Sequence, residues 1–208
     1  MDSSVSLEEK NYQAIVTHFG DLGSLKQLPG LAIQRLMEKG YGFGGEGDWK
    51  TAAMVRLMKI MTQGIEETQR ELPSWRTTHT TSCRARKGCL QAHMLEVCPT
   101  IADGPISIKC QPLSMGDRED PARLVFTAKE GPAVATSLID LGDRFRLIIN
   151  RCRLQEDGEA DARELPVATA FLDTTARPPE QVAEAWILAG WSSPYSITLM
   201  TFDTGTDG

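Results

Sequence analysis

The sequence predicts an α/β piece over residues 1–88, followed by a mostly antiparallel, β-barrel-like domain over residues 89–190 and an aberrant tail over residues 191–208. Two helix-period patterns lie before residue 67. Short apolar runs separated by turn signals begin near Leu90, which is typical of an antiparallel sheet or barrel. Between these parts, residues 72–87 fit neither period and are expected to form a loop.

Two amphipathic helices are predicted in the first part, after a short candidate strand at residues 14–16. Residues 28–40 have Pro29 near the first helical position and Gly40 just beyond the last. The second helix is expected from Trp49 to about Glu66, with Asp48 as its N-cap. An apolar stripe at spacings of three and four residues is expected to lie in the core; it consists of Met54, Met58, Met61 and Ile65.

Six short apolar runs predict the strands of the second part. They are residues 94–97, 106–108, 123–126, 133–139, 144–149 and 167–171. One further helix is expected from about residue 179 to residue 188. The tail has no identifiable partner strand, so we expect an open sheet edge there.

Composition excludes several classes of protein. The 208 residues carry a net charge of −6, which gives no reason to expect nucleic acid or an anionic membrane as partner. The N-terminus lacks the basic and apolar regions of a signal peptide, and no apolar run approaches membrane length. Five cysteines without CxxC pairs favour reduced thiols. We therefore expect a cytoplasmic protein.

Glu96 is a lone acid among apolar neighbours in the stretch QAHMLEVCP, residues 91–99. The pattern predicts a short buried strand carrying one carboxylate. A buried carboxylate is usually neutralised, paired or bound to a metal, because transferring an unpaired charge out of water costs several kcal/mol. A half-exposed strand glutamate is the alternative.

Two local patterns suggest other ligands. GFGGEG at residues 42–47 matches the GxGxxG dinucleotide fingerprint, but a helix is predicted to end at Gly40 where the fingerprint needs a buried strand. A tight turn into a capped helix explains these glycines better. Four potential zinc ligands also lie within fifteen positions, without the paired spacing of zinc knuckles: His79, Cys83, Cys89 and His93.

Six longer segments occur in the order found in one enzyme family: SLKQLPGLA (24–32), GYGFGGEGDWKTAA (40–53), AHMLEVCP (92–99), EDPARLVF (119–126), SLIDLGDRFRLI (137–148) and AEAWILAG (183–190). They resemble L-arabinose isomerase. The resemblance covers most of residues 7–190 but less than half of a family chain. It implies the end of a doubly wound central domain, followed by most of a C-terminal β-barrel domain.

The resemblance implies an aldose–ketose isomerase that converts L-arabinose to L-ribulose, and often D-galactose to D-tagatose, with a divalent metal that is typically Mn²⁺. Proton transfer between adjacent sugar carbons through an enediol needs a base, an acid and a cation near the developing oxyanion. The family supplies two glutamates and two histidines around the metal, and forms oligomers. Glu96 matches one of these glutamates and is expected to be a catalytic and metal-binding residue.

The other three family residues are replaced in this chain. Gln111 stands in place of one histidine, and its amide oxygen is a poorer Mn²⁺ ligand than imidazole. Residues 190–195, GWSSPY, stand in place of the GGAHHT motif, and residues 70–80 in place of GTSFMEDYTYH. With suitable synonymous codons, a nucleotide sequence that encodes either replacement reads as the family motif in another frame. Our hypothesis is that two frame shifts produced residues 71–86 and the tail after Gly190.

These departures predict a truncated and inactive fragment of an L-arabinose isomerase, with weak or absent Mn²⁺ binding. No convergent histidine or second glutamate is expected around Glu96. The alternative is a non-enzymatic subunit that associates with intact isomerase subunits. A dinucleotide-binding module is the third and least supported interpretation.

Overall fold

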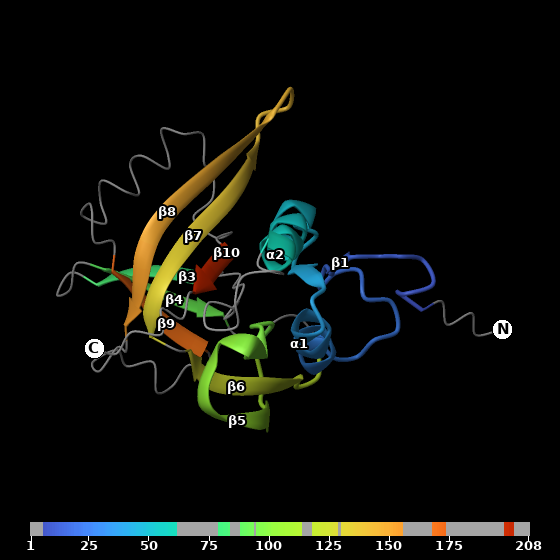
Figure 1. Cartoon of the computed structure of the whole chain (residues 1–208). Helices are drawn as coiled ribbons and strands as arrows, with labels where there is room; N and C mark the ends of the chain where they lie inside the picture. Colours follow the sequence, from blue (N-terminus) through green and yellow to red (C-terminus); the bar gives the residue numbers. More distant parts are fainter. Residues whose placement is uncertain are drawn as a thin grey trace.

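The computed structural model describes residues 6–61, 79–83, 88–93, 95–113, 118–128, 130–155, 168–173 and 198–201. These residues form a mixed α/β structure with three sheets (Figure 1). A parallel pair of strands lies with two helices in the first part of the chain. An antiparallel pair and a six-stranded sheet follow.

The first part is built around a strand–helix–strand unit. Strand β1 (Ala14–Val16) pairs in parallel with β2 (Gly42–Gly44), and helix α1 (Gly30–Glu38) lies between them in sequence. Parallel strands need such a crossover connection because the end of the first strand and the start of the second lie at opposite edges of the sheet. The α/β prediction for this part is therefore confirmed, as is the strand at residues 14–16.

Helix α1 ends as its sequence predicts. Gly40 has a φ of +100°, the left-handed conformation that glycine adopts without steric cost. Its N–H donates to Met37 O at 2.9 Å, and the N–H of Tyr41 donates to Leu36 O at 3.1 Å. This pair of bonds is a Schellman motif, which satisfies carbonyls that the helix leaves without partners.

Helix α2 (Trp49–Met61) begins at the predicted N-cap. The Asp48 carboxylate accepts hydrogen bonds from Thr51 N at 3.0 Å and from Thr51 Oγ1 at 2.7 Å. Met54 and Met58 are buried as expected, but Met61 is 71% exposed, so the methionine stripe does not extend that far. Ile65 and the predicted helix end at Glu66 lie outside the described residues.

The GxGxxG pattern is divided between two structures: Gly42–Gly44 forms the buried strand β2, and residues 45–47 form the expected tight turn into the capped helix, where Asp48 N donates to Gly45 O at 3.0 Å. A Cβ on Gly44 would lie 1.9 Å from Asp48 O, and one on Gly42 would lie 2.1 Å from Ala52 O. Glycine is therefore needed at both positions because α2 packs directly on the backbone of β2. The glycines of β2 serve this close helix–strand contact.

The core of the first part includes a residue from beyond β4 (Gly88–His93). Buried side chains from α1, β2 and α2 pack with Cys98 in one cluster, whose members are Ile33, Met37, Phe43, Val55 and Cys98. The segment that carries Glu96 is thus packed against α1 and α2.

The second part is antiparallel, as predicted. Strand β5 (Ala102–Cys110) pairs with β6 (Ala122–Ala128), with a bulge between Asp103 and Ser107. The six-stranded sheet has the order β10-β7-β8-β9-β4-β3. Its other strands are β3 (His79–Cys83), β7 (Gly131–Asp140), β8 (Phe145–Gln155), β9 (Ala168–Asp173) and β10 (Thr198–Thr201). No pairing between β3 and β10 closes this sheet within the described residues, so the expected barrel is not seen there.

Three predictions about strands are wrong. Of the strand expected at residues 94–97, the described residues 95–97 are not in a strand, and the ladder pairing of β4 ends at His93. The expected loop at residues 72–87 contains β3, which pairs with β4 because backbone hydrogen bonding does not require an apolar face. The tail has a partner after all, since Thr198–Thr201 pairs with β7 at residues 133–136. The helix expected at residues 179–188 lies outside the described residues.

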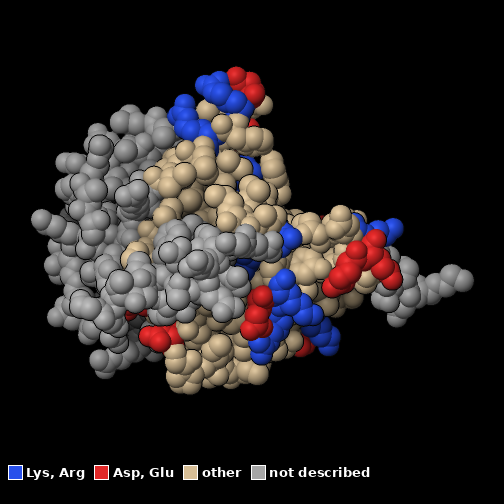
Figure 2. Space-filling view, in the orientation of Figure 1, with Lys and Arg blue, Asp and Glu red and all other residues tan. Residues whose placement is uncertain are grey.

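The surface mixes charges of both signs. In Figure 2, lysine and arginine side chains lie close to acidic ones on this face, over the first part of the chain and at the tip of the β7–β8 hairpin. Two such contacts are the ion pairs Lys26–Glu119 and Arg144–Asp143. Within the described residues, no helix is long and apolar enough to cross a membrane.

Candidate functional site

Glu96 lies in a buried, non-helical segment between β4 and the 3-10 helix η2 (Pro99–Ile101). Its exposed fraction is 8%, and its neighbours Leu95 and Val97 are 4% and 2% exposed. The predicted burial is confirmed, although the expected strand is not. The segment is held by contacts other than a strand ladder.

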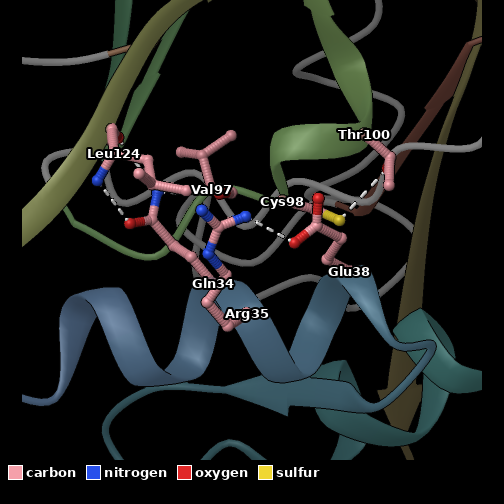
Figure 3. A network of polar contacts seen from close by, with 7 residues as sticks. All are labelled: Gln34, Arg35, Glu38, Val97, Cys98, Thr100 and Leu124. Atoms are coloured by element: carbon pink, nitrogen blue, oxygen red, sulfur yellow. Dashed lines mark hydrogen bonds and ion pairs between the residues drawn. The ribbon is translucent and has the colours of Figure 1, made fainter. Parts of the chain in front are cut away.

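Gln34 of α1 makes three hydrogen bonds through its side-chain amide, one to this segment and two to Leu124 of β6 (Figure 3). Its Nε2 donates to Val97 O at 2.9 Å and to Leu124 O at 3.0 Å. Its Oε1 accepts from Leu124 N at 2.7 Å. Gln34 has no exposed surface, and its amide uses both N–H groups and its oxygen.

The same face of α1 also contacts the residue on the other side of Glu96. Gly30 is four residues before Gln34, so the two lie one above the other on the helix. A Cβ on Gly30 would lie 2.5 Å from Leu95 Cδ1 and 3.0 Å from Ala122 O. Helix α1 therefore contacts both neighbours of Glu96, Leu95 through Gly30 and Val97 through Gln34.

A lysine lies close to the other end of the segment. Lys59 of α2 is 8% exposed, and its Nζ donates to Cys98 Sγ at 3.4 Å. Cys98 Sγ also lies 3.2 Å from Thr100 Oγ1 (Figure 3). The buried Lys59 amine thus contacts Cys98, the residue two positions after Glu96.

Gln111 lies at the end of β5, where it contacts a buried arginine. Arg123 Nη1 donates to Gln111 O at 3.2 Å, and Arg123 Nη2 donates to Gln111 Oε1 at 3.5 Å. Arg123 is 1% exposed, and its Nε has no hydrogen-bond partner within the described structure. Burial lowers the pKa of this guanidinium, while Cys110 and Asp120 act in the opposite direction.

The residues that the structure describes do not fit a resident divalent metal. No group of three histidine, cysteine, aspartate or glutamate side chains comes together among them. The amide oxygen of Gln111, which would have to bind a cation, instead accepts a hydrogen bond from a guanidinium. A Mn²⁺ ion bound to this oxygen would lie close to the positively charged guanidinium of Arg123 and be repelled by it. Gln111 is therefore unsuited to hold Mn²⁺.

The zinc interpretation also fails on geometry. The register of β3 and β4 places His79 opposite Ala92, beside His93, and places Cys83 opposite Gly88, beside Cys89. The histidines and cysteines are therefore at opposite ends of the strand pair, about 13 Å apart at 3.3 Å per residue. Zinc bonds of about 2.0–2.3 Å cannot bridge that separation.

The remaining positions in place of family ligands are mostly outside the described residues. Residues 190–195 and 70–78 are not described. His79 and Thr80 belong to β3.

Comparison with known proteins identifies the family. Residues 4–64 match the L-arabinose isomerase central domain, and residues 77–202 match the L-arabinose isomerase C-terminal domain. The second match alone covers more than half of the chain. The chain belongs to the L-arabinose isomerase family.

Individual L-arabinose isomerases confirm this assignment. The enzyme of Geobacillus stearothermophilus is 52% identical over 185 residues, those of Serratia proteamaculans and Halalkalibacterium halodurans 49% and 48%. In each comparison the alignment covers 88% of this chain but 36% of the relative. The chain thus spans about a third of the length of these L-arabinose isomerases.

Sequence reasoning missed the two α1 residues that contact the Glu96 segment. Gln34 directly follows Ile33 and lies three residues before Met37, and both of those belong to the core cluster. A polar side chain on such a face is a signal for a buried hydrogen-bond partner. Its partners, which are 63 and 90 residues away, could not be read from the sequence.

Proposed function

We propose that this chain carries part of an L-arabinose isomerase active site and is inactive as it stands. Glu96 is the acid–base and metal-binding glutamate that the chain retains. The observation that supports this role is the burial of Glu96 at 8% exposure, in the segment AHMLEVCP and between two neighbours that α1 contacts.

The proposed reaction makes a specific demand on this residue. Interconversion of L-arabinose or a related aldose with its ketose moves a proton between adjacent carbons, so a carboxylate must lie within hydrogen-bond reach of that proton. Small misplacements of such a group are costly in rate. A rigidly packed segment meets this demand better than a mobile loop.

Two observations support the absence of activity. Gln111 replaces a histidine of the family and has its amide oxygen against Arg123. In addition, the described residues do not assemble three metal ligands. One carboxylate gives weak binding of a divalent cation, so the Mn²⁺ that the family uses would supply little charge stabilisation to this chain.

The test is an isomerase assay on the purified chain. With L-arabinose and Mn²⁺, the wild-type chain is expected to form no more L-ribulose than the Glu96→Gln variant forms. Formation of L-ribulose that depends on both Mn²⁺ and Glu96 would contradict the proposed inactivity while supporting the role of Glu96.

The frame-shift hypothesis has a separate test. Sequencing the gene shows whether the codons for residues 71–86 and 191–208 spell family motifs in another frame. A nucleotide sequence that cannot spell them in any frame removes the hypothesis, without bearing on Glu96.

An assembly role is the second candidate, and one observation favours it. Alternate residues of β8 expose large apolar side chains: Phe145 is 56%, Leu147 49% and Ile149 59% exposed. Successive side chains of a strand alternate between faces, so these three lie on one side of β8. Such a row is typical of an interaction surface, here for intact isomerase subunits or a second copy.

Co-purification of the tagged chain with an intact L-arabinose isomerase tests this role. We expect a Leu147→Lys variant to lose the association. A chain that elutes as a monomer and captures no isomerase would exclude both the assembly role and a homo-oligomer.

A further inference from the structure

Helix α1 and the Glu96 segment meet in an unusual contact. Most of the α1 core face is apolar, yet the residue with the most specific contacts to the segment is Gln34, which has no exposed surface. Its hydrogen bonds reach Val97, the residue after Glu96, and Leu124 in β6. One amide therefore joins three separate parts of the chain.

The pairing with Leu124 fixes the amide itself. Leu124 donates to Oε1 and accepts from Nε2, so the amide and the Leu124 backbone form a closed pair of hydrogen bonds. This arrangement also sets the orientation of the amide, because a flipped group would place N–H against N–H and oxygen against oxygen. The second N–H is then directed at Val97 O at 2.9 Å.

Gly30 adds a steric limit on the other side of Glu96. With no Cβ, Gly30 lets Leu95 pack against the α1 backbone, where a Cβ would lie 2.5 Å from Leu95 Cδ1 and 2.9 Å from Leu95 Cγ. The segment therefore cannot move toward α1 at Leu95 without a clash, nor away from α1 at Val97 without breaking a buried hydrogen bond. The backbone that carries Glu96 is restrained from both sides.

We propose that Gln34 is a positioning residue for Glu96: its amide fixes the Val97 backbone relative to β6 and so sets where the Glu96 carboxylate lies. This inference rests on the proposed function for the role of the Glu96 carboxylate in the isomerase site. The restraint itself is independent of metal and sugar.

The structure offers a matched control for Gln34. Gln27 also joins distant parts of the chain by an amide hydrogen bond, from its Nε2 to Asp120 O at 2.8 Å. It is exposed, and its amide hydrogen bond runs to Asp120 rather than to the Glu96 segment. Gln27→Met therefore removes the same kind of bond without touching Val97.

Carboxyl labelling of the full chain with a carbodiimide and glycine ethyl ester, read by mass spectrometry at Glu96, measures the restraint. In Gln34→Met, which preserves side-chain length, Glu96 should label about tenfold faster than in the wild type, because three buried backbone groups lose their partner and local opening becomes easier. Gln27→Met should label at the wild-type rate.

A third variant separates positioning from general destabilisation. Met58→Ala removes a buried side chain of α2 whose sulfur accepts a hydrogen bond from Thr136 of β7. Its urea midpoint should fall, yet Glu96 should label within about twofold of the wild type, since the hydrogen bond from Gln34 to Val97 O is kept in this variant. If Gln34→Met fails to fold, Gly30→Ala takes its place, with the same increase expected.

Two results would overturn the proposal. One is labelling of Glu96 at the wild-type rate in the folded Gln34 or Gly30 variant. The other is an equal increase in Met58→Ala at a matched loss of stability. Neither result depends on turnover or Mn²⁺ binding, so failure of the positioning role is distinguishable from failure of the proposed isomerase site.

Discussion

Gln34 and Arg123 are both fully buried polar residues, but they differ in how their hydrogen-bonding groups are satisfied. Every polar atom of the Gln34 amide has a partner, whereas Arg123 Nε has none within the described residues. A buried charge with an unpaired N–H opposes folding, while a satisfied buried amide costs little. Substitution of these two residues should therefore change the stability of the chain in opposite directions.

Replacement of Arg123 by Met should not destabilise the chain. The variant removes a buried cation at similar side-chain length, so the free energy of unfolding should be unchanged or higher by about 1–2 kcal/mol. Urea denaturation at pH 7 measures this. A loss of more than about 2 kcal/mol would show that the contacts with Gln111 outweigh the desolvation of the guanidinium.

The Arg123 penalty should be independent of pH between about 5 and 9, because an arginine side chain keeps its proton throughout that range. Burial lowers the pKa of Arg123, so the folded chain releases this proton before the unfolded chain does as pH rises. Stability gained in this way belongs to the strongly alkaline range, where the unfolded state binds more protons. The difference in unfolding free energy between the wild type and Arg123→Met should therefore stay constant at pH 5–9 in urea titrations.

At the level of single elements, the packing of α2 on β2 requires glycine at Gly42 and Gly44. Gly44→Ala should destabilise the chain by about 3 kcal/mol or more, because the new Cβ meets backbone atoms that cannot rotate away. Gly23→Ala is the control: its φ is +54° and nothing lies within 4 Å of a new Cβ. That variant should lose only about 1–2 kcal/mol from the left-handed conformation. Equal losses in urea denaturation would argue against close packing of α2 on β2.

The N-cap of α2 gives a second prediction at this scale. Asp48→Ala removes the acceptor of two hydrogen bonds from Thr51 and should cost about 1–2 kcal/mol. Asp143→Ala, which removes an exposed ion pair with Arg144, should change the unfolding free energy by less than about 0.5 kcal/mol. Circular dichroism during thermal unfolding compares the two variants.

Local signals predicted the elements that depend on local chemistry. The Gly40 stop of α1, the Asp48 cap of α2 and the strands from residue 102 to residue 155 are confirmed, because caps, turns and alternation act within a few residues. Contacts between distant segments could not be predicted in this way. The apolar residues Leu95 and Val97 pack against α1 rather than in a strand ladder, and the partner of β10 lies about 65 residues earlier in the chain.

The whole chain belongs to the L-arabinose isomerase family but spans 36% of the relatives it matches. Family motifs predicted Glu96 as a site residue, and its burial is consistent with that role. The environment of Gln111 could not be predicted from the sequence, since its contact with Arg123 is made across the loop that joins β5 to β6. The domain boundaries at residues 88 and 190 stay predictions.

The central claim is that Glu96 is the retained member of an incomplete metal site. Calorimetric titration of the purified chain with Mn²⁺ tests it most directly, with Glu96→Gln as the control. We predict only weak binding, with a dissociation constant of about 1 mM or higher, as expected for a single carboxylate without convergent ligands. Stoichiometric binding near 1 μM, a gain of about 4 kcal/mol over that value, would contradict the account if Glu96→Gln abolished it.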